Sequence, residues 1–144
     1  MAKHIERSAL VSFSAWQMYE LVNDVEAYPR FLDGCVDAEI LARGEHFMEA
    51  RLDLKKGKLA KSFVTRNALV PGKRIELQLV EGPFKTLEGI WTFQPLGDAG
   101  CKVSLSMTFE FESKLVSLAA DPWFESMANQ LVSAMCERAR EIYE

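Results

Sequence analysis

The sequence has few of the residues that build metal centres and nucleophilic active sites. It contains two histidines, His4 and His46, and three cysteines that stand far apart, Cys35, Cys101 and Cys136. It has no Cys-x-x-Cys pair, no phosphate-binding loop and no nucleophile elbow, and the ligand spacing typical of zinc sites is missing. We therefore expect no metal site and no catalytic residues. An odd number of scattered cysteines also favours reduced thiols in a cytoplasmic compartment.

Long apolar runs and an excess of positive charge are missing as well. No run approaches the length of a transmembrane helix, so we expect no transmembrane segment, and residues 1–7 lack the apolar stretch of a secretory signal. The formal net charge of −4 argues against bulk electrostatic binding of DNA, although it leaves room for a local basic patch. A length of 144 residues suits a single domain spanning 1–144.

The most regular pattern is an apolar helix face near the end of the chain. Asp121 suits an N-cap and Pro122 the first helical position, so we predict one long helix from Asp121 to Glu144. At 1.5 Å per residue it would be about 36 Å long, and its apolar face needs a large apolar surface to lie on. Residues 113–120 are predicted as a helical turn or a lead-in segment. The apolar face consists of Phe124, Met127, Ala128, Leu131, Met135, Ala139 and Ile142.

Most of the preceding chain alternates apolar and polar residues in the manner of β-strands. One strand is predicted within residues 4–12 and six between residues 35 and 112, the clearest of them over 103–112. Two short helices are predicted, one at 15–23 after the capping-box spacing of Ser14 and Gln17, and one at 24–32 that Asp24 can cap. Because short turns join the strands, the sheet should be antiparallel with one apolar face. The order is one strand, two helices, six strands and one helix, an α+β protein whose curved sheet wraps the C-terminal helix.

Two further features each allow two interpretations. Lys55, Lys56, Lys58, Lys61 and Arg66 form the one basic concentration, which Lys73 and Arg74 on the next turn could extend; it is either a solvated hairpin or a surface that binds a partner. Arg138 lies at the margin of the apolar helix face, where its guanidinium either reaches solvent, faces a cavity or pairs with an acid.

Several motifs together resemble a known family. Residues 24–32 read Asp-Val-x-x-Tyr-Pro-x-Phe-Leu, and further matches lie at 63–67, 82–93, 109–111 and 138–143. They are similar to the START-type family that contains ribosome association toxins and coenzyme Q-binding proteins, within the polyketide cyclase/dehydrase and lipid transport superfamily. The resemblance implies a helix-grip fold, in which a seven-stranded curved sheet and a long C-terminal helix enclose a cavity. One departure is Asp33–Gly34, where the family commonly has proline after Phe-Leu.

The resemblance implies two functions. Bacterial members bind the large ribosomal subunit and block subunit joining, whereas mitochondrial relatives bind ubiquinone and support respiration. Our leading hypothesis is a non-enzymatic binding protein without a resident cofactor, whose apolar cavity takes ubiquinone or another isoprenoid lipid. The alternative is a small enzyme of the cyclase or hydratase kind, which would need a buried acid/base pair.

The hypothesis places the ligand between the apolar strand face and the C-terminal helix. Gly89 would leave room for it, and an aromatic cluster around Tyr28 would close one end. The expected ligand-binding residues are Tyr28, Pro29, Phe31, Leu32, Leu87, Gly89, Trp91, Phe93, Phe109, Phe124, Met127 and Leu131. The expected ribosome-binding residues are Lys55, Lys56, Lys58, Lys61 and Arg66.

Overall fold

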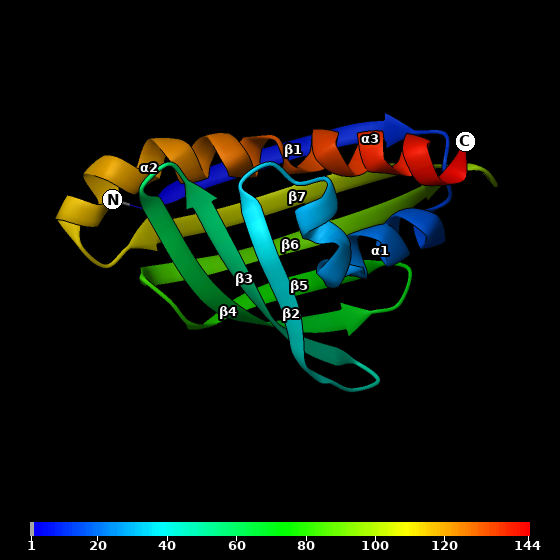
Figure 1. The fold of residues 1–144 in the computed structure, drawn as a ribbon. Helices are drawn as coiled ribbons and strands as arrows, with labels where there is room; N and C mark the ends of the chain where they lie inside the picture. The colour runs from blue at the N-terminus through cyan, green and yellow to red at the C-terminus, as the bar shows by residue number, and fades with distance from the viewer. Residues whose placement is uncertain (1) are drawn as a thin grey trace.

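A curved antiparallel sheet forms the framework of the protein (Figure 1). The computed structural model describes residues 2–144, in which seven strands line up in the order β1-β7-β6-β5-β4-β3-β2. Every neighbouring pair is antiparallel, as the short turns predicted. The strands are β1 (Lys3–Val11), β2 (Cys35–Arg43), β3 (Phe47–Lys56), β4 (Leu59–Val70), β5 (Arg74–Glu81), β6 (Phe84–Leu96) and β7 (Gly100–Phe111).

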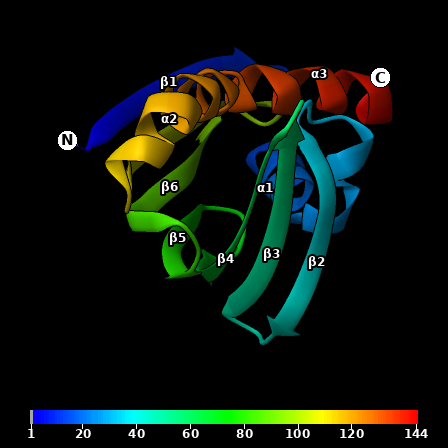
Figure 2. The same ribbon diagram turned by 60° about the vertical axis from the view of Figure 1, so that its left-hand side comes forward.

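The helices occupy the concave side of this sheet. Helices α2 (Lys114–Asn129) and α3 (Leu131–Tyr143) lie along β1 and β7, while α1 (Ala15–Asn23) packs against β6, β7 and α3. Figure 2 shows how the sheet curls from β1, which runs alongside α2 at the top, round to β2 and β3 on the opposite side. The predicted order of elements and the wrapped architecture are therefore confirmed. No helix within residues 2–144 is both long and apolar enough to cross a bilayer.

The two short N-terminal helices form at the predicted places. Ser14 and Gln17 make the expected capping box, with the Ser14 Oγ accepting from the Gln17 backbone N–H at 3.1 Å. The second helix, η1 (Val25–Arg30), is a 3₁₀ helix that contains Pro29, and Asp24 makes no side-chain capping bond to it. Asp24 therefore occupies the predicted N-cap position without capping through its side chain; the turn is held by the backbone, including Ala27 N–H to the Asp24 carbonyl at 3.2 Å.

The C-terminal helix differs from the prediction in its start and its continuity. It begins at Lys114, capped by Ser113, so Asp121 is not an N-cap and Pro122 lies inside α2. The Asp-Pro pair is typical of a helix start, but Ser113 offers an earlier cap and Ala120 is fully buried, so packing continues the helix through the proline. The helix is also interrupted at Gln130, which separates α2 from α3.

The apolar face crosses this interruption with a small rotation. Ala128 and Val132, on either side of Gln130, are both buried, and Cys136 continues the row one turn later. Ile142, which the periodicity assigned to this face, is 47% exposed. The rotation follows from the break, because a straight helix phased from Phe124 would bring Ile142 rather than Cys136 toward the sheet.

Five phenylalanine rings form the core at the α2 end of the sheet. Phe124 of α2 meets Phe109 at 4.7 Å and Phe84 at 5.1 Å between ring centroids. Such tilted and edge-on pairs add stabilisation beyond their buried area. This ring cluster fills the space between α2 and strands β4, β6 and β7, and consists of Phe63, Phe84, Phe109, Phe111 and Phe124.

The three cysteine thiols are all buried and free. Burial raises the pKa of Cys35 and of Cys101 from their ordinary value of 9.0 to about 11, and it raises the pKa of Cys136 as well. The thiolate is the reactive form, so the folded protein should not react with Ellman's reagent in mildly alkaline buffer, whereas the denatured chain should titrate all three thiols.

The raised thiol pKa values also make the stability of the fold depend on pH. Because the folded-state pKa lies above the unfolded one, the folded state holds its thiol protons longer, and stability should fall as the pH rises from about 9 toward 11. Urea unfolding at a series of pH values measures this. Rapid reaction of the native thiols, or stability that rises over this interval, would contradict the buried placement.

Candidate functional site

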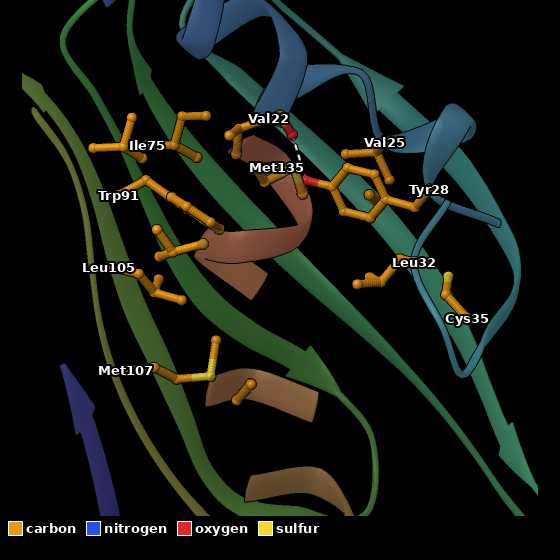
Figure 3. Packing of buried hydrophobic residues seen from close by; sticks show 14 of the residues in the cluster. Val22, Val25, Tyr28, Leu32, Cys35, Ile75, Trp91, Leu105, Met107 and Met135 are labelled. Atoms are coloured by element: carbon orange, nitrogen blue, oxygen red, sulfur yellow. Dashed lines mark hydrogen bonds between the residues drawn. The ribbon is translucent and has the colours of Figure 1, made fainter. Parts of the chain in front are cut away.

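A small apolar cavity lies between the concave face of the sheet and the helices. Its volume is about 80 Å³. α1 and η1 form one wall, β3 to β7 the floor, and α2 with the first residue of α3 the cover. Figure 3 shows Trp91 and Met107 projecting from the sheet on one side, with Tyr28 and Leu32 facing them from the other. The apolar lining is Val22, Val25, Tyr28, Leu32, Ala50, Leu52, Leu54, Phe63, Ile75, Leu77, Leu87, Trp91, Met107, Phe124, Met127, Ala128 and Leu131.

Seven of the twelve residues expected to bind a ligand reach this cavity. The aromatic members are buried, with Trp91 only 2% exposed. Tyr28 donates its hydroxyl hydrogen to the Val22 carbonyl, and burial raises its pKa above the ordinary range, assisted by Cys35 and Asp24. Contact with a ligand stays a prediction for all of them. They are Tyr28, Leu32, Leu87, Trp91, Phe124, Met127 and Leu131.

The other five expected residues lie elsewhere. Phe93 stacks beside Trp91 but turns beneath α1, where its ring meets Tyr19 edge-on at 5.9 Å. Phe109 belongs to the ring cluster. Phe31 packs edge-on against Tyr28 at 5.9 Å, outside the cavity. Pro29, next to Tyr28 in η1, is also absent from the lining.

Gly89 does not open the space that the sequence suggested. A Cβ atom there would lie 3.5 Å from Leu77 Cδ1 and 3.2 Å from the Ser106 carbonyl oxygen. Gly89 pairs with Leu77 on β5 and with Met107 on β7, and both of these neighbours line the cavity. The Leu77 side chain therefore covers the position, and the glycine serves close packing between strands rather than ligand access.

The cavity also contains polar groups that the sequence analysis missed. Thr65 and Asn67 point inward from β4, and the Thr65 hydroxyl donates to the Asn67 Oδ1 at 2.9 Å. They are the buried polar side chains of residues 2–144. Asn23, the last residue of α1, also lines the cavity, and its Oδ1 is buried without a hydrogen bond in the described structure. Strand parity in the sequence could have identified Thr65 and Asn67, because positions 65 and 67 share parity with the buried Phe63 and Leu69.

Few ionisable groups reach the cavity. Of its lining residues, Glu88 is exposed, and the Tyr28 hydroxyl is engaged by the Val22 carbonyl. Neither Thr65 nor Asn67, the buried polar side chains of the lining, serves as an acid or base near neutral pH. His4 lies on the outer strand β1, hydrogen-bonded to Thr108, and is exposed, as is His46. Within residues 2–144, no three His, Cys, Asp or Glu side chains gather in a way that could hold a metal ion.

The loop after η1 closes the cavity toward α2. Gly34 adopts a φ of 93°, its carbonyl accepts from the Lys55 backbone N–H at 2.8 Å, and a Cβ there would lie 3.2 Å from the Met127 sulfur. Glycine tolerates this left-handed backbone without strain. The Asp33–Gly34 departure therefore lets the loop lie directly against α2.

Arg138 pairs with an acid, which is one of the three arrangements that the sequence allows. Its Nη1 lies 3.2 Å from the Glu141 Oε2, and its guanidinium carbon lies 5.2 Å from the centre of the Phe31 ring. Its Nε is buried without a hydrogen bond in the described structure. Arg138 does not line the cavity, so its role here is to hold α3 against the segment after η1.

The basic residues separate into two groups. Lys55, Lys56 and Lys58 are exposed at the β3–β4 turn, and Lys61 follows on β4; none of the four joins an ion pair with a described residue. We call these four residues the hairpin lysines. Arg66 lies farther along β4 and does not belong to them.

The Arg66 guanidinium interacts with two residues of β3. It pairs with Glu49 at 2.9 Å and lies 4.1 Å above the Phe47 ring. Lys73 and Arg74 follow the opposite end of β4, about 40 Å from the hairpin lysines at 3.3 Å per residue. The structure therefore does not join them into one continuous positive edge.

The comparisons with known proteins agree with this geometry. The family described as "Polyketide cyclase / dehydrase and lipid transport" matches residues 11–136. The chain is 48% identical to the Ribosome association toxin RatA of Vibrio cholerae, over 98% of both proteins. It is 30% identical to the mitochondrial Coenzyme Q-binding protein COQ10 homolog B of Xenopus laevis, covering 99% of this chain and 61% of that protein.

Solved structures show the same fold at low sequence identity. The Zhui aromatase/cyclase from Streptomyces sp. R1128 superposes with a TM-score of 0.87 at 18% identity, covering 100% of this chain and 97% of the other. A START superfamily protein from Mycobacterium smegmatis superposes with a TM-score of 0.73 at 23% identity, covering 94% and 97%. At these identities the likeness concerns the fold alone.

Proposed function

Because the chain belongs to the polyketide cyclase/dehydrase and lipid transport family, we propose that it is a non-enzymatic binding protein that associates with the large ribosomal subunit in the cytoplasm. The observation that carries this proposal is the 48% identity to a ribosome association toxin over 98% of both chains. A match that covers 98% of both chains includes the surface as well as the core. Blocking of subunit joining is the expected consequence of such binding.

The hairpin lysines are the part of the surface that suits ribosomal RNA. Lys55, Lys56 and Lys58 are exposed and lack ion-pair partners in the described structure, so their ammonium groups are available to phosphates. The net charge of −4 means that the rest of the protein repels RNA on balance. Binding through one local basic projection therefore gives both affinity and a defined orientation.

Co-sedimentation with separated ribosomal subunits tests this proposal. Purified protein is mixed with large or small subunits and centrifuged through a sucrose cushion at several salt concentrations. We expect recovery with the large subunit, and a decrease in recovery as salt increases, because phosphate contacts release counterions. Equal recovery with both subunits, or recovery with neither, would overturn the proposal.

A second candidate function is binding of a quinone-like isoprenoid lipid in the cavity. The apolar lining, with few polar groups, is typical of sites for such ligands, and the COQ10 homologue named above is a coenzyme Q-binding protein. At about 80 Å³ the cavity is smaller than the roughly 300–1,000 Å³ of most ligand pockets. Binding of a quinone would therefore require the lining to move apart, and the flexible side chains of Met107 and Met127 are suited to this change.

Tryptophan fluorescence provides the test. Trp91 lines the cavity, whereas Trp16 is 52% exposed and Trp123 lies by the Gly34 loop. In the double variant Trp16→Phe/Trp123→Phe, a short-chain ubiquinone should quench the remaining emission and saturate at one ligand per chain. Free N-acetyltryptophanamide is the control for collisional quenching. A linear response that matches this control would exclude a quinone in the cavity.

A further inference from the structure

Two polar side chains interrupt the apolar floor of the cavity. Thr65 and Asn67 are 9% and 5% exposed, and both face inward from β4. Across the ladders they neighbour Ala50 on β3 and Leu77 on β5, which are apolar members of the same lining. Burying polar groups in such surroundings costs free energy unless every donor and acceptor finds a partner.

The pair satisfies only part of its own hydrogen-bonding capacity. Thr65 donates to the Asn67 Oδ1 at 2.9 Å, and this fixes the orientation of the Asn67 amide. The Nδ2 group of Asn67 has no hydrogen bond to any residue within 2–144. An amide has two N–H donors, so the cavity contains donors that are held in place and have no protein acceptor.

A second, independent polar atom shares the cavity. Asn23 reaches it from the C-terminal end of α1, and its Oδ1 is buried and unpartnered in the described structure. Thus a donor from the sheet and an acceptor from α1 open onto one enclosed apolar space. Two other lining residues carry polar groups: the Tyr28 hydroxyl is already engaged by the Val22 carbonyl, and Glu88 is exposed.

We propose that Asn67, oriented by Thr65, donates a hydrogen bond to a ring oxygen of the cavity ligand, and that Asn23 accepts from a ligand hydroxyl or from water beside it. The site would therefore select a ring bearing carbonyl or hydroxyl oxygens over a hydrocarbon ring of the same shape. This inference rests on the second candidate function, and it adds the chemical basis of selectivity. A site built to hydrogen-bond an oxygen disfavours an analogue that lacks it, because the buried amide is then left without an acceptor.

A matched pair of probes tests the inference. Duroquinone and durene carry the same four ring methyl groups and differ in the two carbonyl oxygens of the quinone. Duroquinone binding is followed by quenching of Trp91 in the Trp16→Phe/Trp123→Phe background, and durene binding by its relief of that quenching. The starting protein should bind duroquinone more tightly than durene.

Asn67→Leu should remove this preference. We expect about 3- to 10-fold weaker duroquinone binding, the scale of one neutral hydrogen bond, with durene affinity unchanged or higher. Thr65→Val frees the amide without deleting it and should give a smaller loss for duroquinone alone. Leu118→Met, an apolar exchange at an exposed position of α2 outside the cavity, is the control that should not separate the two probes.

The outcomes distinguish a failure of lipid binding from a failure of the polar anchor. If the starting protein binds neither probe, the lipid-binding function fails. If it binds duroquinone but Asn67→Leu and Thr65→Val both leave the ratio of the two affinities unchanged, the function stands and the polar anchor is wrong. Circular dichroism of each variant checks folding, because replacing one member of a buried hydrogen-bonded pair leaves the other member unsatisfied.

Discussion

Phe109→Ala should lower the free energy of unfolding by about 3–5 kcal/mol, the range typical of a buried aromatic residue replaced by alanine. The Phe109 ring is fully buried, and it contacts Phe124 of α2 at 4.7 Å and Phe111 at 6.1 Å between centroids. Its removal leaves a void in the ring cluster that neighbouring β-strands cannot close, because their spacing is set by backbone hydrogen bonds.

Urea denaturation followed by circular dichroism measures this loss. The control is Leu118→Ala, which removes an apolar side chain that is 81% exposed in α2 and should change stability by less than about 0.5 kcal/mol. A loss below about 1 kcal/mol for Phe109→Ala would indicate that Phe109 borders open space after all. That result would support the sequence-based prediction that Phe109 lines the cavity.

The triple variant Lys55→Glu/Lys56→Glu/Lys58→Glu should reduce affinity for the large ribosomal subunit by about 100-fold near physiological salt. Each lysine that contacts a phosphate contributes about 0.7–0.9 to the slope of log affinity against log salt, so the slope should flatten by about two or more if all three make contact. The three side chains are exposed, so the fold should survive.

A matched variant separates a local contact from a general charge effect. Lys73, Lys85 and Lys102 are also exposed but lie on other parts of the surface, and their replacement by glutamate changes the net charge by the same amount. We expect this control to keep most of the binding and most of the salt slope. Equal losses in both variants would mean that net charge, and not the hairpin, governs association with the ribosome.

Much of the candidate site follows from strand parity, and the rest from where the helices lie. Strand parity correctly predicts that Leu87 and Trp91 face inward. The same parity turns Thr65 and Asn67 inward, although their polar side chains do not mark them as part of an apolar face. Parity did not distinguish Trp91 from Phe93, since both face the same way. The difference arises because α1 covers Phe93 through Tyr19 and leaves Trp91 facing the cavity.

By itself, the sequence determined the order of the elements, the seven strands, the capping box of α1 and the antiparallel sheet, because turns, caps and a two-residue period depend on near neighbours in the chain. Only the tertiary structure decided that α2 begins at Lys114, that Leu77 fills the space beside Gly89, and that Arg66 is engaged by Glu49. Each of these depends on side chains from segments distant in sequence. The size of the cavity is decided in the same way, since it is the volume left when the sheet, α1 and α2 have packed together.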